Sequence, residues 1–106
     1  MPGNDYSLKF TPEARDDLFE IFQYIAVVLA APGAAETLID KIEKDCRRLT
    51  LFPFSCPIPC DAALAKKGYR MLVVDNFIAF YQVDEATAIV RIMRVVYGKR
   101  NYRQLL

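Results

Sequence analysis

The sequence predicts an α+β fold with the element order β-α-α-β-β-β, and three patterns support this prediction. Residues 6–10 alternate apolar and polar side chains, which is typical of a short strand with one buried face. Two longer stretches, 12–29 and 34–51, repeat apolar residues at helical spacing. The last third of the chain, 69–106, holds β-branched and aromatic runs of strand length separated by turn residues. We therefore expect a small twisted antiparallel sheet with an αα-hairpin packed on one face.

The length and composition of the chain indicate a single domain, 1–106. With 106 residues and 54% hydrophobic content, the chain can fill one core but not two. No apolar run approaches the ~18 residues of a membrane span, so we expect no membrane segment. Three cysteines, an odd number, and the lack of a signal peptide predict a cytoplasmic protein. Without any histidine, the C-x3-C pair cannot supply four ligands, and we expect no metal site.

The expected helices have recognisable ends. Thr11 suits an N-cap, and Pro12 suits the first helical position, so the first helix should run from there to about Leu29. The second is expected from about Ala34 to Leu51, followed by a loop that prolines stiffen as far as residue 64.

The strands of the last third are expected to be joined by tight turns. Asp75 and Asn76 tolerate positive φ, as a type I′ hairpin requires. With both helices on one face of the sheet, the other face should be free to bind a partner.

Charge is unevenly distributed along the chain, although the net charge is only +1. Residues 1–65 carry six Lys or Arg against ten Asp or Glu, whereas residues 66–106 carry eight against three. The basic half coincides with the expected sheet, which favours contact with phosphate, the alternative being ordinary solvated charge.

Five stretches, in this order and spacing, carry a resemblance to a known family: 17–25 (DLFEIFQYI), 49–53 (LTLFP), 68–70 (GYR), 77–84 (FIAFYQVD) and 94–102 (RVVYGKRNY). Together they resemble the RelE/ParE toxins of bacterial type II toxin–antitoxin modules, over nearly the whole chain. The resemblance implies a compact α/β fold with a small twisted antiparallel sheet. It also implies a cognate antitoxin protein that wraps the toxin and blocks its active surface.

The family resemblance implies one of two targets. One branch resembles ribosome-dependent mRNA endonucleases, for which the ribosome and mRNA are partners; the other poisons DNA gyrase and has no nuclease chemistry. We expect mRNA cleavage because the last expected strand is followed by the segment Gly98-Lys99-Arg100, which carries two cations. Leu72 and Ile78 argue the other way, since the endonuclease branch has further basic residues at these places. A non-catalytic module that binds nucleic acid or protein is a third interpretation.

Cleavage of RNA by its own 2′-hydroxyl needs cations, a base and an acid, and no cofactor. The resemblance places basic catalytic residues at Arg70 and Arg100. Arg94 joins them as a catalytic candidate or forms a structural ion pair, and Tyr97 transfers a proton or only packs. We expect these four residues and Lys99 to converge on one concave patch. The remaining candidates are expected to bind nucleic acid together with Lys99: Lys66, Lys67, Tyr102 and Arg103.

Overall fold

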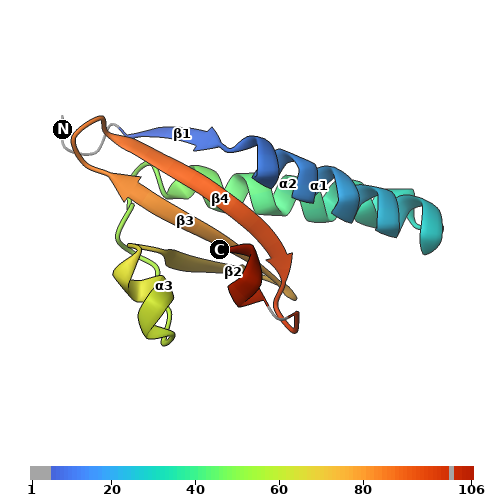
Figure 1. Ribbon diagram of the computed structural model, residues 1–106. Coiled ribbons are helices and arrows are strands. Elements are labelled where there is room, and N and C mark those ends of the chain that lie inside the picture. The colour runs from blue at the N-terminus through green and yellow to red at the C-terminus, as the bar shows by residue number, and fades with distance from the viewer. Residues whose placement is uncertain (1–5, 101) are drawn as a thin grey trace.

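The computed structural model of the chain describes residues 6–100 and 102–106. The predicted order is confirmed, and Figure 1 shows its elements: β1 (Ser7–Phe10), α1 (Pro12–Gln23), α2 (Pro32–Arg48), β2 (Arg70–Val74), β3 (Phe77–Asp84) and β4 (Ile89–Tyr97). Three further elements were not expected: a π-helical turn η2 (Tyr24–Val28), a short helix α3 (Ala62–Lys66) and a 3-10 helix η3 (Tyr102–Leu105).

The four strands form one sheet in the order β1-β4-β3-β2. Strands β2, β3 and β4 are an antiparallel meander, as expected. Strand β1 pairs with β4 in parallel, so the sheet is mixed and the expectation of a wholly antiparallel sheet needs correction. The two legs of the αα-hairpin return the chain to the end of the sheet where β1 starts. Strand β2 therefore runs in the direction of β1, and so does β4 after two reversals.

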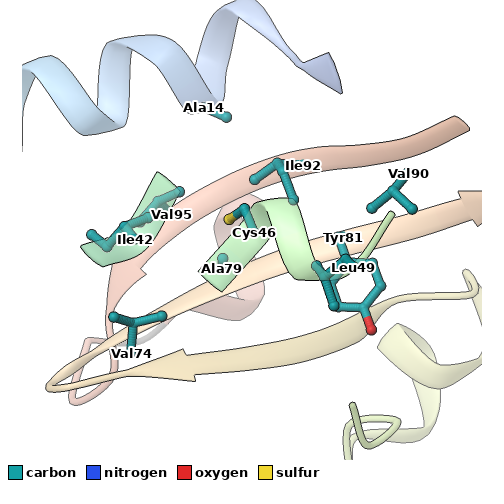
Figure 2. Packing of buried hydrophobic residues seen from close by; sticks show 10 residues of the cluster. All are labelled: Ala14, Ile42, Cys46, Leu49, Val74, Ala79, Tyr81, Val90, Ile92 and Val95. Carbon is teal, nitrogen blue, oxygen red and sulfur yellow. The ribbon is translucent and has the colours of Figure 1, made fainter. Parts of the chain in front are cut away.

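Hydrophobic cores lie on both faces of the sheet. Under α1 and α2, as Figure 2 shows, Ile42, Cys46 and Leu49 pack on inward-facing strand residues such as Tyr81 and Ile92. The opposite face has its own buried cluster of Leu64, Tyr69, Ile78, Phe80 and Val96, against which residues of η3 and its neighbourhood pack. The prediction that this second face is free was wrong, because its apolar side chains are covered by α3 and by the end of the chain.

The first helix starts as its sequence predicts and ends differently. The Thr11 hydroxyl accepts a hydrogen bond from the Ala14 N–H at 3.0 Å and donates one to the Met93 carbonyl at 2.8 Å, which ties the helix to β4. The regular α-helix stops at Gln23 and continues as the π-helical turn. Ala30 then takes a positive φ of 53°. The second helix begins at Pro32, two residues before its expected start, and ends at Arg48.

The hairpin between β2 and β3 has the expected two-residue loop, since Val74 pairs with Phe77. Only Asp75 has a positive φ, of 53°, so the turn is not type I′. The Asp75 carboxylate lies 2.6 Å from the Lys41 ammonium on α2, and this hydrogen bond raises the pKa of Lys41. In the part of the chain that is described, no helix has the length and apolar character needed to cross a bilayer.

Candidate functional site

A groove of about 580 Å³ lies between α1 and the end of β4. Both α1 and η2 form one wall, and the start of β3 and the end of β4 form the other. Most of its surface is apolar, with carboxylates on one side and a guanidinium on the other. It is lined by Asp17, Glu20, Ile21, Tyr24, Ile25, Leu29, Phe77, Val95, Val96, Tyr97 and Arg100. Its size and its few polar groups are those of a pre-formed binding site.

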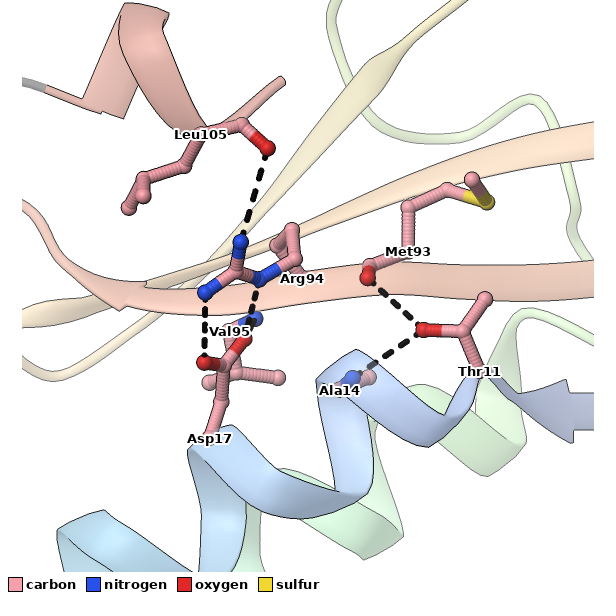
Figure 3. Close-up of polar contacts among 7 residues, drawn as sticks. All are labelled: Thr11, Ala14, Asp17, Met93, Arg94, Val95 and Leu105. Atoms are coloured by element: carbon pink, nitrogen blue, oxygen red, sulfur yellow. Dashed lines mark hydrogen bonds and ion pairs between the residues drawn. The ribbon is translucent and has the colours of Figure 1, made fainter.

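The floor of the groove is held by an ion pair between Asp17 and Arg94. The Asp17 carboxylate accepts hydrogen bonds from Arg94 Nε at 2.7 Å, from Arg94 Nη2 at 2.8 Å and from the Val95 N–H at 2.9 Å (Figure 3). These bonds raise the pKa of the Arg94 guanidinium, which therefore stays charged. Arg94 Nη1 also reaches the Leu105 carbonyl at 3.5 Å. The structural ion pair that was the alternative interpretation of Arg94 is present.

Tyr97 and Arg100 stand at the mouth of the groove. The Tyr97 ring is 42% exposed and meets the Phe77 ring edge-on, with 5.7 Å between centroids. The Gly98 N–H donates to the Asn76 carbonyl at 2.8 Å, and the Arg100 N–H donates to the Tyr97 carbonyl at 3.0 Å, so the chain turns back beside β3. Lys99 is also exposed on this turn. Three of the five residues expected in one patch are therefore neighbours here.

Arg70 lies elsewhere, and the expectation that it joins this patch was wrong. It pairs with Tyr81, which in turn pairs with Ile92, five positions before Tyr97 on β4. At about 3.3 Å per residue, this is roughly 16 Å away along the sheet. The physical reason is that β2 and β4 both run antiparallel to β3, so the start of β2 lies level with the middle of β4 and well short of its end.

The guanidinium of Arg70 binds the loop that follows α2. Its Nη1 donates to the Cys56 carbonyl at 2.7 Å and to the Phe54 carbonyl at 3.3 Å. The same group lies 5.0 Å from the centre of the Phe54 ring. In this structure Arg70 is a residue that fixes a loop.

Of the residues expected to bind nucleic acid, Lys66, Lys67 and Tyr102 lie on the second face of the sheet, whereas Lys99 lies on the turn beside the groove. Lys66 and Lys67 follow one another at the end of α3, and Lys67 Nζ donates to the Leu106 carbonyl at 2.9 Å. The Tyr102 ring packs against Phe80 with centroids 4.8 Å apart. The side chain of Arg103 lies outside the described part of the chain. Nucleic-acid binding by this set stays a prediction.

A family model described as the ParE toxin of the type II toxin–antitoxin system parDE matches residues 8–102. The chain belongs to the ParE toxin family. No curated protein sequence matches it. Among the residues that the structure describes, no group of three or more His, Cys, Asp or Glu side chains is placed to hold a metal ion.

Two solved structures share the fold of this ParE-family chain. One is described as the chromosomal ParDE system from P. aeruginosa, with a TM-score of 0.74, 23% identity, and coverage of 91% of this chain and 99% of that one. The other is the toxin–antitoxin complex RelBE2 from Mycobacterium tuberculosis, with a TM-score of 0.62, 22% identity, and coverage of 88% and 91%. At these identities the likeness concerns the fold.

Sequence reasoning missed the helical wall of the groove in this ParE-family chain. Residues 12–29 were expected to form an amphipathic helix, and no binding role was assigned to Glu20, Tyr24 or Leu29. A signal was present, because residues 21–35 contain no charged side chain at all, although they form the end of one helix and the start of the next. A helix that is apolar around most of its circumference presents apolar surface beyond its own core contacts.

Proposed function

We propose that this ParE-family toxin acts by binding DNA gyrase and does not cleave mRNA. One observation supports this proposal above the others: the cations that a nuclease needs around a single phosphate lie apart. Arg70 binds a loop and lies level with the middle of β4, whereas Arg100 follows the end of β4. The remaining arginine of the expected set, Arg94, is paired with Asp17.

The state of Arg94 makes it a poor group for stabilising a phosphorane. Two of its N–H groups are bound by one carboxylate, and its side chain is only 21% exposed. A transition state gains from donors that are pre-aimed at the developing charge. An incoming phosphate would have to displace Asp17, leaving a carboxylate and the Val95 N–H without their partner. That loss opposes the gain that a catalytic arginine supplies.

The sheet face opposite α1 and α2 also argues against binding of mRNA. Its centre consists of Ile78, Phe80 and Val96, all nearly or fully buried. Tyr102, Leu105 and Leu106 cover this centre from the end of the chain. A polyanion gains nothing from such a surface, because RNA contact relies on cations and on aromatic rings free to stack. A target that is a protein fits the exposed surfaces of this molecule better.

We assign the groove beside α1 to the cognate antitoxin. It offers apolar walls from Ile21, Ile25 and Val95, an acid in Glu20 and a cation in Arg100. An amphipathic antitoxin segment would place apolar side chains in the groove and opposite charges at its two rims. The two similar structures are described as a ParDE system and a RelBE2 toxin–antitoxin complex, which supports an antitoxin as the partner.

The proposal is tested by inducing the chain in cells and following DNA and protein synthesis separately. We expect DNA synthesis to stop first while messages on ribosomes stay intact, and co-expression of the antitoxin to restore growth. Early loss of protein synthesis with new breaks in ribosome-bound messages would contradict the proposal and support the nuclease. Full growth with no effect on either process would contradict both.

A further inference from the structure

An exposed apolar loop follows α2, on the side of the molecule away from the turn between β2 and β3 (Figure 1). Residues 51–58, which we call the apolar loop, carry four large side chains that are about half exposed or more: Leu51 (54%), Phe52 (63%), Phe54 (48%) and Ile58 (54%). Single exposed apolar residues are common on protein surfaces, but a concentrated group in one short segment marks an interaction site.

The apolar loop is held in one shape by the sheet beneath it. The buried Tyr81 hydroxyl donates to the Pro53 carbonyl at 2.9 Å, and the Met71 N–H on β2 donates to the Pro57 carbonyl at 3.0 Å. Arg70 adds its two hydrogen bonds to the loop and its contact with the Phe54 ring. These contacts fix four successive parts of the loop backbone, yet they leave its apolar side chains in solvent.

A loop that is already ordered before it binds favours association with another protein. Ordering a flexible segment on association costs free energy that subtracts from affinity, and a pre-formed loop avoids that cost. Prolines at 53 and 57 lower the flexibility of the unbound loop further. Rigid, exposed aromatic side chains are the residue type that dominates the energetics of protein–protein interfaces. The loop therefore has the properties of a docking element for another protein.

The charge around the apolar loop defines the chemistry of its partner. Residues 46–70 carry five Lys or Arg against one Asp, a balance of +4, whereas the whole chain has +1. One of these cations, Arg48, is paired with Asp45 just before this segment, which leaves a balance of +3. The single acid, Asp61, turns its carboxylate to the N–H groups of Ala63 and Leu64 at the start of α3. A second copy of the chain is a poor partner, because two such basic rims would repel each other. The complementary surface is an apolar pocket bordered by carboxylates.

We propose that the apolar loop is the surface through which this chain contacts its protein target, and that it enters an apolar, acid-rimmed pocket there. The inference rests on the proposed function, which makes DNA gyrase that target. The groove beside α1 and the apolar loop then serve two partners at separate places on the molecule. Arg70 is a positioning residue in this scheme, since it acts by holding the loop.

Supercoiling of relaxed plasmid by purified gyrase tests this inference, with matched pairs of substitutions. Phe52→Ser/Ile58→Ser removes apolar surface from the loop, and Phe19→Ser/Val73→Ser removes similarly exposed apolar surface from α1 and β2. We expect the loop variant to need at least about thirtyfold more protein for half inhibition, the size of a hot-spot loss. The control variant should stay within about twofold of the parent, on the same scale.

A second pair of variants tests the charged rim without touching the loop. Arg47→Glu/Lys66→Glu reverses rim charges, and Lys9→Glu/Arg15→Glu makes the same change elsewhere. The rim variant should inhibit supercoiling less than the parent, and its inhibition should depend less on salt concentration. The control variant should match the parent in both respects. Urea unfolding of each variant checks that it is folded.

The outcomes separate the inference from the function on which it rests. Loop and control variants that inhibit gyrase equally would overturn the inference and leave the proposed function intact. Loss of self-association in the loop variant, with inhibition retained, would make a second copy the partner and would also overturn it. A parent chain that leaves supercoiling unchanged would overturn both.

Discussion

Asp17 on α1 and Arg94 on β4 lie 77 positions apart in the sequence and are joined by hydrogen bonds of 2.7 and 2.8 Å. The same carboxylate binds the Val95 N–H, so one side chain ties the first helix to the last strand. Both side chains are mostly shielded from water, with 11% and 21% exposure. Removing one member of a shielded pair leaves the other charge uncompensated, which costs more than the pair itself contributes.

The replacement Asp17→Ala should therefore destabilise the fold by about 3 kcal/mol, because it leaves the Arg94 guanidinium and a strand N–H without an acceptor. The free energy of unfolding in urea measures this loss. The control is Lys41→Ala, which breaks a pair with Asp75 in which the two side chains are 51% and 49% exposed. Exposed pairs contribute little, so the control should cost much less than Asp17→Ala. Equal costs for the two variants would contradict the structural role of Asp17.

Replacing glycine by alanine should change the stability of the fold in opposite directions at Gly98 and Gly33. A Cβ added at Gly98 would lie 3.2 Å from the Asn76 carbonyl, which the Gly98 N–H also binds. Gly98→Ala should therefore destabilise the fold by about 1 kcal/mol through crowding. A Cβ at Gly33 meets nothing within 4 Å, and this residue lies in α2. Gly33→Ala should stabilise the fold by about 0.5 kcal/mol through helix propensity. Thermal unfolding of both variants checks the signs, and a gain for Gly98→Ala would refute the crowding.

Ala30 is strained, since it adopts a φ of 53° just after the π-helical turn. The left-handed region costs a residue with a Cβ about 1 kcal/mol, and glycine avoids this cost. Ala30→Gly should raise the free energy of unfolding by several tenths of a kcal/mol, whereas Ala34→Gly in the first turns of α2 should lower it by up to about 1 kcal/mol. If both variants lose stability, Ala30 is not strained as described.

The three cysteines should differ in reactivity because of their surroundings. Burial raises the pKa of the Cys46 thiol to about 12, so almost none of it is thiolate at pH 8. Cys60 is exposed and Cys56 is half-buried. With a thiol reagent at pH 8, the native chain should react at Cys60 first and not at Cys46, while all three react in urea. Rapid labelling of native Cys46 would contradict its burial.

The same burial predicts a fall in stability at alkaline pH. The folded pKa of Cys46 is raised above its ordinary value of 9.0, so its contribution is fully present below pH 9 and is lost as the pH rises towards 12. Burial also raises the pKa of Tyr69 and Tyr81, which adds to the loss in this range. Unfolding in urea should therefore need less denaturant at pH 10 than at pH 8.

Local signals predicted the elements of the fold well, because they act over a few residues. Thr11 and Pro12 mark the start of α1, and Asp75 takes the positive φ that its turn needs. The π-helical turn after Gln23 had no such signal, since residues 24–28 continue the helical apolar spacing. The short helix α3 was missed because prolines before it favoured a loop, although Asp61 is a good N-cap.

The candidate site was harder to predict, because it depends on which strand ends meet. Arg70 and Arg100 were placed together on the assumption that the start of β2 meets the end of β4. The meander instead places the start of β2 level with the middle of β4, away from Arg100. Arg94 had two interpretations from sequence, and only the packing of α1 on β4 brings Asp17 to it. The catalytic roles expected for Tyr97 and Arg100 stay predictions.

The action of this chain on gyrase can be measured directly as the supercoiling of relaxed plasmid by purified gyrase in the presence of increasing amounts of the chain. If the chain acts on gyrase, supercoiling falls with dose, and the same preparation leaves messages on translating ribosomes at full length. Complete supercoiling at every dose, together with cleavage of ribosome-bound mRNA by the same preparation, would contradict action on gyrase. That result would support mRNA cleavage as the function.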